Sequence, residues 1–143
     1  MTDIEIEGLA EAIQKYRGAS RKLGLAMRET MRNSLNVLHE KVPPYPPPPS
    51  DSTYRRTGTL GRTLGSRRGG GRAGLPDIYR VTGSTKNIEG AFGTRLDYAP
   101  YVISDDDQAW MHKGRWWTMN TVADRARSKI KKLWNDLINK ILE

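Results

Sequence analysis

The sequence contains no cysteine, and it has few of the large apolar residues that build a protein core. Without cysteine the chain has no disulfide, no thiolate nucleophile and no cysteine-ligated zinc site. Only 36% of its 143 residues are hydrophobic and Phe occurs once, against 14 glycines and 8 prolines. A chain of this length predicts one domain, residues 1–143, but so thin a core favours burial against a partner.

Long hydrophobic runs are also missing. No stretch approaches the roughly 20 apolar residues that a membrane-spanning helix needs. The first residues, from Met1 to Glu5, lack the basic and then apolar pattern of a signal peptide. The sequence therefore predicts no membrane partner, and the lack of cysteine fits a protein made in a reducing compartment.

Positive charge is in excess, with a formal net charge of +8, but it is unevenly distributed. Residues 51–75 contain six arginines and one aspartate, and residues 113–143 contain eight basic and three acidic residues. Residues 76–112 reverse the sign, with three basic and six acidic residues. This alternation predicts complementary faces that bind an acidic partner, nucleic acid or further copies of the chain.

Apolar residues recur at steps of three and four over residues 8–42, which predicts one long N-terminal helix ended by Pro43 and Pro44. Unbroken, this helix would measure about 50 Å. A compact domain of this size has a radius of gyration of only about 14–15 Å. The helix therefore either breaks, near Gly18 or Gly24, or projects and exposes its apolar stripe to a partner.

The next segment is rich first in proline and then in glycine and arginine. Residues 43–50 predict an extended polyproline spacer, with an SH3 or WW ligand as the alternative. Residues 66–74 predict a flexible basic loop between two strands. This loop lacks the Gly-Lys-Ser/Thr ending of a phosphate-binding loop, so we do not expect phosphate chemistry there.

Strand patterns follow the loop. Alternation and strand-forming residues predict strands over residues 78–82, 88–93 and 98–103, and residues 116–118 predict a short fourth. Pro100 places the third strand at an edge or a bulge, because proline cannot donate to a strand ladder.

A second amphipathic helix is predicted over residues 121–142, opened by a capping box of Thr121 and Asp124. The fold class predicted is α+β. The long N-terminal helix and the C-terminal helix pack on one face of a small, mainly antiparallel sheet of three to four strands with a long basic loop.

Three consecutive aspartates with a nearby histidine are the strongest enzymatic candidate: Asp105, Asp106, Asp107 and His112. A divalent metal needs carboxylates that converge on one point, whereas neighbours on an extended chain point to opposite faces. The spacing of a calcium loop is also missing. A solvated acidic turn accounts for the run, and a metal-dependent hydrolase stays an alternative. We expect no enzymatic activity, no metal and no cofactor.

Aromatic residues flank this acidic run on both sides. Such residues, together with Lys113 and Arg115, are typical of protein interfaces and also of surfaces that bind single-stranded nucleic acid. Composition does not separate these two interpretations. We expect five residues to form a sheet-packing or interface patch: Tyr98, Tyr101, Trp110, Trp116 and Trp117.

The order of these features forms a pattern. A long helix and a proline break precede Arg56-Thr57-Gly58-Thr59-Leu60, and a Gly/Arg loop, a strand pair, Tyr98-Ala99-Pro100-Tyr101-Val102 and a C-terminal helix follow. This order resembles the tail-completion proteins (neck, or head–tail joining proteins) of long-tailed bacteriophages, over most of the chain. In that family an Arg-Thr-Gly-x-Leu segment opens the sheet and a Tyr-Ala-x-Tyr-Val strand lies near its end. The matching residues here are Arg56, Thr57, Gly58, Leu60, Tyr98, Ala99, Tyr101 and Val102.

The resemblance has one departure. In the family Glu-x-Gly-Thr often follows the Tyr-Ala-x-Tyr-Val strand, and here Ile103-Ser104-Asp105-Asp106 stands in its place.

The resemblance implies a non-enzymatic virion protein, assembled in the host bacterial cytoplasm. It implies a ring, typically of six copies, at the head–tail junction, with the connector and the tail-tube or terminator protein as partners. A ring needs heterologous interfaces, which complementary faces supply. Arg67, Arg68 and Arg72 are expected to contact a neighbouring copy, the terminator or the DNA channel. A small basic nucleic-acid-binding protein, with non-specific contact to DNA, is the alternative.

Overall fold

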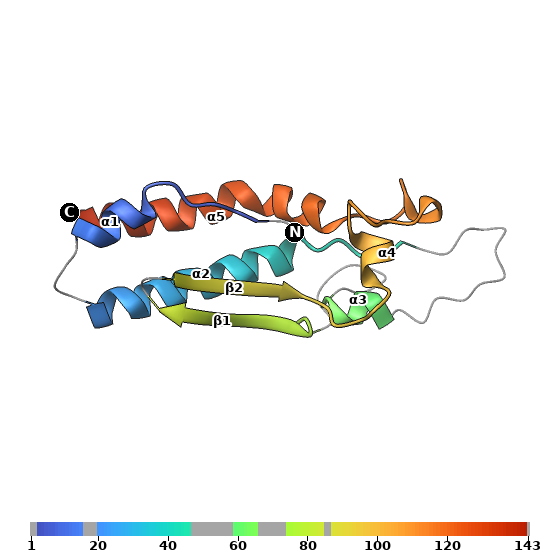
Figure 1. Cartoon of the computed structure of the whole chain (residues 1–143), viewed down its shortest axis with the longest axis horizontal. Coiled ribbons are helices and arrows are strands. Elements are labelled where there is room, and N and C mark those ends of the chain that lie inside the picture. Colours follow the sequence, from blue (N-terminus) through green and yellow to red (C-terminus); the bar gives the residue numbers. More distant parts are fainter. Residues whose placement is uncertain (1–2, 16–19, 47–58, 66–73, 85–86, 143) are drawn as a thin grey trace.

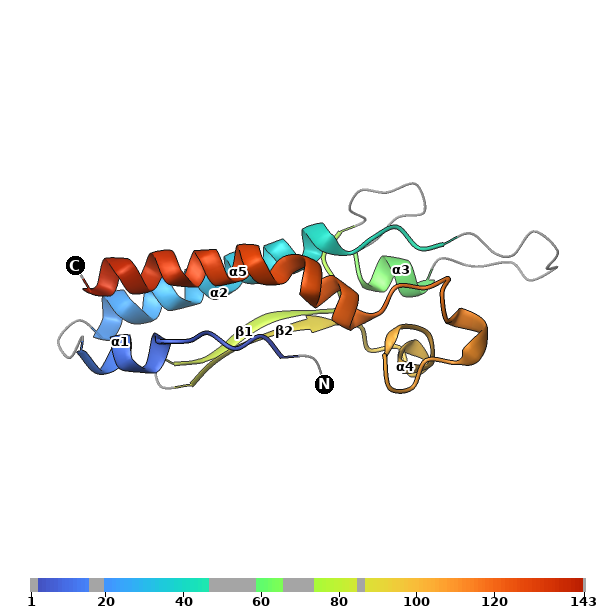
Figure 2. The ribbon, with the colours of Figure 1, turned by 90° about the horizontal axis from the view of Figure 1, so that it is seen from above.

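The computed structural model describes residues 3–15, 20–46, 59–65, 74–84 and 87–142. The chain is α+β, as predicted, and its elements form two layers (Figures 1 and 2). One layer holds the two long helices, and the other holds the first short helix, residues 3–8 and a β-hairpin. Three short helices lie together at one end. In chain order the elements are α1 (Leu9–Lys15), α2 (Ser20–Lys41), α3 (Thr59–Thr63), β1 (Ile78–Ser84), β2 (Asn87–Gly93), α4 (Ala99–Ile103), the 3₁₀ helix η1 (Trp110–His112) and α5 (Met119–Leu142).

The single helix predicted over residues 8–42 is two helices. α1 ends at Lys15 and α2 begins at Ser20. Gly24 lies inside α2, and Gly18 lies between the two helices, outside the described residues. α1 packs against α5 instead of extending α2 (Figure 1). The projecting helix is therefore wrong, because both halves of the apolar stripe are buried in one core: Ala12 of α1 with Leu23 and Met27 of α2.

The main core lies between α2 and α5, and the predicted C-terminal helix is confirmed. Trp134 of α5 is 2% exposed, and its indole N–H donates to Ser34 Oγ of α2 at 3.0 Å. At the outer side of the same interface, Lys129 Nζ donates to Glu40 Oε2 at 3.1 Å. None of the helices in the described ranges is long and apolar enough to cross a membrane.

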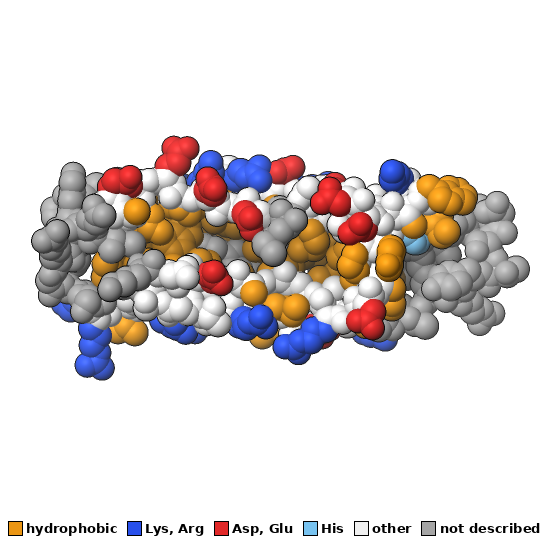
Figure 3. Space-filling view, in the orientation of Figure 1, with side chains coloured by type: hydrophobic (Ala, Val, Ile, Leu, Met, Phe, Trp, Pro, Cys, Tyr) orange, Lys and Arg blue, Asp and Glu red, His pale blue; other side chains and the backbone are white. Residues whose placement is uncertain are grey.

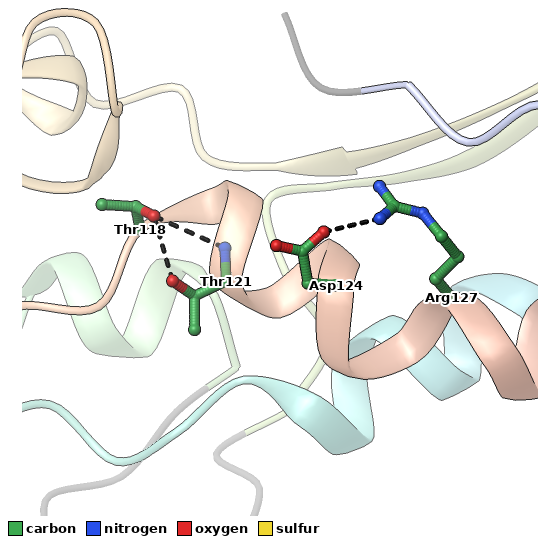
Figure 4. A network of polar contacts seen from close by, with 4 residues as sticks. All are labelled: Thr118, Thr121, Asp124 and Arg127. Atoms are coloured by element: carbon green, nitrogen blue, oxygen red, sulfur yellow. Dashed lines mark hydrogen bonds and ion pairs between the residues drawn. The ribbon is translucent and has the colours of Figure 1, made fainter.

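The start of α5 differs from the predicted capping box by one turn (Figure 4). Thr118, just before Met119, accepts the backbone N–H of Thr121 on its Oγ1 at 3.4 Å. Asp124 does not reach back to the cap; its Oδ1 accepts from Arg127 Nη1 at 2.7 Å. A hydroxyl that accepts an N3 amide is the usual N-cap geometry, and Thr118 fills it in place of Thr121.

The two strands predicted after the basic loop are confirmed as an antiparallel hairpin, with Ile78 opposite Gly93 and Ser84 opposite Asn87. α2 covers one face of this hairpin. A Cβ built on Gly90 would lie 2.6 Å from Met31 Sδ, so glycine permits this close approach. On the other face Arg80, Thr82 and Glu89 are exposed. The prediction that both long helices lie on the sheet is wrong, because α5 packs mainly against α2 and α1.

The third and fourth predicted strands are wrong. Residues 98–103 contain the helix α4, and residues 116–118 lead into α5, so the described sheet has two strands. Pro100 lies in the first turn of α4, where its fixed φ suits a helix and its missing N–H costs nothing. Ala99, Val102 and Ile103 are buried, which is the spacing of one helical face.

Two further predictions fall largely outside the described residues. The proline spacer 43–50 is described only to Pro46, and the basic loop 66–74 only at Gly74. Tyr45, within the described part of the spacer, packs against the core at the α4 end.

Candidate interaction surface

The three short helices are held by a second core, separate from the one between α2 and α5. Leu64 of α3 is fully buried at 0% exposure, and Ala99, Val102 and Ile103 of α4 pack with it. Phe92, from the end of β2, joins this cluster and connects it to the hairpin. The second core therefore forms a packed base beneath the solvent-exposed side chains of α4 and η1.

Hydrogen bonds fold the loop after α4 back onto that helix. The side-chain amide of Gln108 donates to the carbonyl oxygens of Val102 at 2.7 Å and Trp116 at 3.3 Å. The backbone N–H of Ala109 donates to Tyr101 O at 2.7 Å. Because Ala109 directly precedes η1, these bonds fix Trp110 close to Tyr101.

Four large apolar side chains stand exposed on this base. Trp110 is 82% exposed, Tyr101 61%, Met111 54% and Tyr98 47%. We call these four residues the aromatic surface. Figure 3 shows hydrophobic side chains gathered at this end of the molecule. Exposed Trp, Tyr and Met on a fixed base are typical of surfaces that bind another protein.

The five aromatic residues singled out in the sequence thus divide into two groups. Tyr98, Tyr101 and Trp110 belong to the aromatic surface. Trp116, 9% exposed, lies in the second core with its ring 5.9 Å from that of Trp117, which packs against the same cluster. Met111 was not anticipated, although methionine beside a tryptophan is typical of interface sequences.

The residues that match the phage family motif also divide. Leu60, Ala99 and Val102 are all buried in the second core. They come from two helices, α3 and α4, and not from the start and end of a sheet. Three other motif residues, Arg56, Thr57 and Gly58, lie outside the described ranges. The three arginines expected to contact a partner, Arg67, Arg68 and Arg72, also lie outside them.

The acidic run lies beside the aromatic surface. Asp105, Asp106 and Asp107 are exposed, and Asp105 Oδ1 accepts the hydroxyl of Thr118 at 2.9 Å. Asp105 thereby helps to position the hydroxyl that caps α5. Within the described ranges, no group of three His, Cys, Asp or Glu side chains is placed to hold a metal ion.

A basic surface lies on α5. Its exposed side chains include two acids, Asp124 and Asp136, and a larger number of bases. The exposed bases are Arg125, Lys129, Lys131, Lys132 and Lys140.

Comparisons with known protein families, with curated proteins and with solved structures find no significant match to this chain. What the chain does is therefore inferred from its own residues.

Proposed function

We propose that this chain is a structural virion protein of a long-tailed phage, which forms a ring at the head–tail junction and joins the tail tube or terminator to the connector. The observation that carries this proposal is the aromatic surface. Exposing Trp110, Tyr101 and Met111 together is unfavourable in water, and a protein partner that covers them gains the free energy of apolar burial. Buried Trp and Tyr side chains are also the residues most often found at interface hot spots.

Charge supports a contact between copies of the chain. Three exposed acids, Asp105, Asp106 and Asp107, and two exposed bases, Lys113 and Arg115, flank the aromatic surface in the chain, whereas α5 exposes an excess of lysine and arginine. Two unlike surfaces of opposite sign suit a heterologous interface, in which one surface of a copy meets a different surface of the next. Repetition of such a contact closes into a ring when the rotation allows it.

The test uses a double variant, Trp110→Ser with Met111→Ser, and a matched control, Leu25→Ser. Leu25 is a similarly exposed apolar residue, at 62%, but it lies on α2 away from the aromatic surface. Purified protein is mixed with tail tubes or connectors and examined by electron microscopy. We expect rings from the native chain and the control and none from the double variant. Native protein that stays monomeric and binds neither particle would contradict the proposal.

A second candidate, a small basic nucleic-acid-binding protein, is favoured by the basic surface of α5. Lysines and arginines on one helix face can track a phosphate backbone. The aromatic surface has no necessary role in that function, so the two candidates differ in which residues they require.

A further inference from the structure

The two strands of the hairpin differ in what covers their outer edges. Arg28 of α2 donates from Nη1 to Gly83 O at 3.1 Å and from Nη2 to Val81 O at 3.3 Å, so a side chain covers part of β1. On β2, Asn87, Glu89 and Gly90 are exposed, and no other described strand pairs with it besides β1. An open strand edge is a template for a further strand.

A second extended segment runs along the same layer. In residues 3–7, Ile4 and Ile6 are partly buried against the main core while Asp3, Glu5 and Glu7 are exposed. This period of two is that of a β-strand with one face buried. Figures 1 and 2 place the segment alongside β2 in one layer, and no backbone hydrogen bond among the described residues joins the two.

The surface between β2 and residues 3–7 is apolar and recessed. Figure 3 shows hydrophobic side chains along the middle of this face and charged side chains of both signs around it. Met31 of α2 lies beneath Gly90, and Ile88 of β2 is partly buried against the main core. We call this region the strand slot: the outer edge of β2, residues 3–7 and the apolar floor between them.

The side of the strand slot formed by residues 3–7 is acidic. From residue 3 to residue 11 the chain carries Asp3, Glu5, Glu7 and Glu11 and no basic residue, and all four are exposed. Glu89 adds an exposed carboxylate on β2. These side chains favour an occupant that carries positive charge, since opposite charges across an interface favour the correct partner and register.

We propose that the strand slot receives an added β-strand from a second copy of the chain, supplied by residues 52–57. These residues, Ser-Thr-Tyr-Arg-Arg-Thr, combine strand-forming Thr and Tyr with two arginines, and they belong to the most basic part of the sequence. Six residues of strand span about 20 Å. The pairing satisfies the open edge of β2 with backbone hydrogen bonds. Because neighbouring strand residues point to opposite faces, one of the two arginines points to the solvent side, where the exposed carboxylates lie, and the other lies along the floor with its aliphatic stem.

The placement of the flanking residues suits contact between copies. Tyr45 and α3, which lie on either side of residues 47–58 in the chain, both pack in the second core with α4. The strand slot lies along the hairpin and α1. The end of one copy therefore meets the flank of the next, which is a heterologous contact. This inference rests on the proposed function only in requiring that copies meet.

The first test needs no assembly. A synthetic peptide of residues 50–59 is added to the purified full chain, and amide hydrogen exchange is followed by NMR. If the dissociation constant is about 1 mM, which corresponds to a binding free energy of about −4 kcal/mol, about 1 mM free peptide occupies half of the slots. We expect exchange to slow at those β2 amides that point away from β1 and to stay unchanged in α5. A peptide with Arg55→Glu and Arg56→Glu is the control and should have no effect. Unchanged exchange with the native peptide would overturn the proposal.

The second test identifies the source of the strand. Because the chain has no cysteine, Glu89→Cys and Arg55→Cys each create a single reactive site. The two variants are mixed under assembly conditions with a short bismaleimide and separated on denaturing gels. A crosslinked dimer supports a strand supplied by a second copy. The control, in which Asp106→Cys replaces Glu89→Cys, should give no crosslinked dimer.

Two outcomes of this experiment count against the second copy. A link formed only within one chain of the Glu89→Cys, Arg55→Cys double variant would show that the segment folds back on itself. Peptide binding without any link would assign the slot to another protein. If the peptide binds but no rings form on tail tubes or connectors, the proposed ring function is rejected, while the proposal that the strand slot binds residues 52–57 is retained.

Discussion

Trp134 fixes how α5 lies on α2. Its indole is buried, and its N–H donates to Ser34 Oγ, which in turn donates to Thr30 O at 2.8 Å. A tryptophan N–H in a core needs such an acceptor, because an unpaired buried donor costs free energy. The chain of two hydrogen bonds therefore selects one position of α5 along α2 among several that would bury similar apolar area.

Replacing Ser34 should reveal the cost of losing that acceptor. We expect Ser34→Ala to lower the free energy of unfolding by about 1–3 kcal/mol, because the indole N–H stays buried without a partner. Ser128→Ala, an exposed position on α5, controls for the higher helix propensity of alanine and should change stability by less than about 0.5 kcal/mol. Urea unfolding measures both. Equal values for the two variants would mean that the hydrogen bond contributes nothing.

Gly65 is required by its conformation and by its neighbour. Its φ is +73°, and a Cβ would lie 2.2 Å from Nε2 of His39, a buried side chain. Gly114 has a similar φ of +78° and no atom within 4 Å of a built Cβ, so it is a matched control. We expect Gly114→Ala to lose about 1–2 kcal/mol from the left-handed backbone alone. Gly65→Ala should lose at least about 1 kcal/mol more in thermal or urea unfolding, because both His39 and the backbone carbonyl of Gly74, whose oxygen would lie 2.6 Å from the Cβ, must move. A Gly65→Ala loss no larger than that of the control would show that His39 and the Gly74 carbonyl give way at no cost.

At the scale of elements, the sequence predicts most reliably the helices whose apolar pattern extends over many residues. The apolar patterns of α2 and α5 extend over more than twenty residues, and the structure contains both helices; the hairpin was predicted from shorter patterns of five and six residues, and the structure contains it as well. The break between α1 and α2 was only one of two alternatives, because the apolar spacing continues across it. α4 was missed because its five residues fit both periods: strand formers favoured a strand, while Ala99, Val102 and Ile103 already had helical spacing. The predicted length of a single helix over residues 8–42 already allowed for a break. In residues 98–103, Pro100 was a signal for the first turn of a helix.

The start of α5 gives a direct test at this scale. Thr118→Ala removes the oxygen that accepts the Thr121 N–H and also releases Asp105, so we expect a loss of about 1 kcal/mol in the free energy of unfolding. Thr121→Ala leaves that oxygen in place and should cost less than half as much. Urea unfolding at neutral pH compares the two. A larger loss from Thr121→Ala would place the cap where the sequence first suggested it.

For the whole molecule, the candidate site was only partly predictable. The sequence identified the aromatic segment, but it could not separate Trp110, which is solvent-exposed, from Trp116, which is buried. That separation depends on the second core, which gathers α3, α4 and the end of β2 from distant parts of the chain. The strand slot likewise needs residues 3–7 and β2 to lie in one layer. No local sequence pattern predicts that two segments so far apart in the chain lie side by side.

Whole-molecule charge leads to a prediction about DNA. A protein of net charge +8 should bind duplex DNA weakly and without sequence preference. We expect Lys131→Ala with Lys132→Ala on α5 to reduce this binding no more than Arg21→Ala with Lys22→Ala on α2, because total charge governs it. Affinity is measured against salt, where each phosphate contact contributes about 0.9 to the slope. A selective loss of slope in the α5 variant would favour the nucleic-acid-binding candidate.

The four tryptophans differ widely in their access to water, and this gives the protein built-in optical reporters. Trp134, sealed between α2 and α5, should emit at short wavelength and resist iodide until the chain unfolds. Trp110 should emit further to the red and be quenched readily in the isolated protein. When the aromatic surface is covered, quenching of Trp110 should fall while the emission of Trp134 stays constant, so joining and unfolding can be told apart in one cuvette without a label.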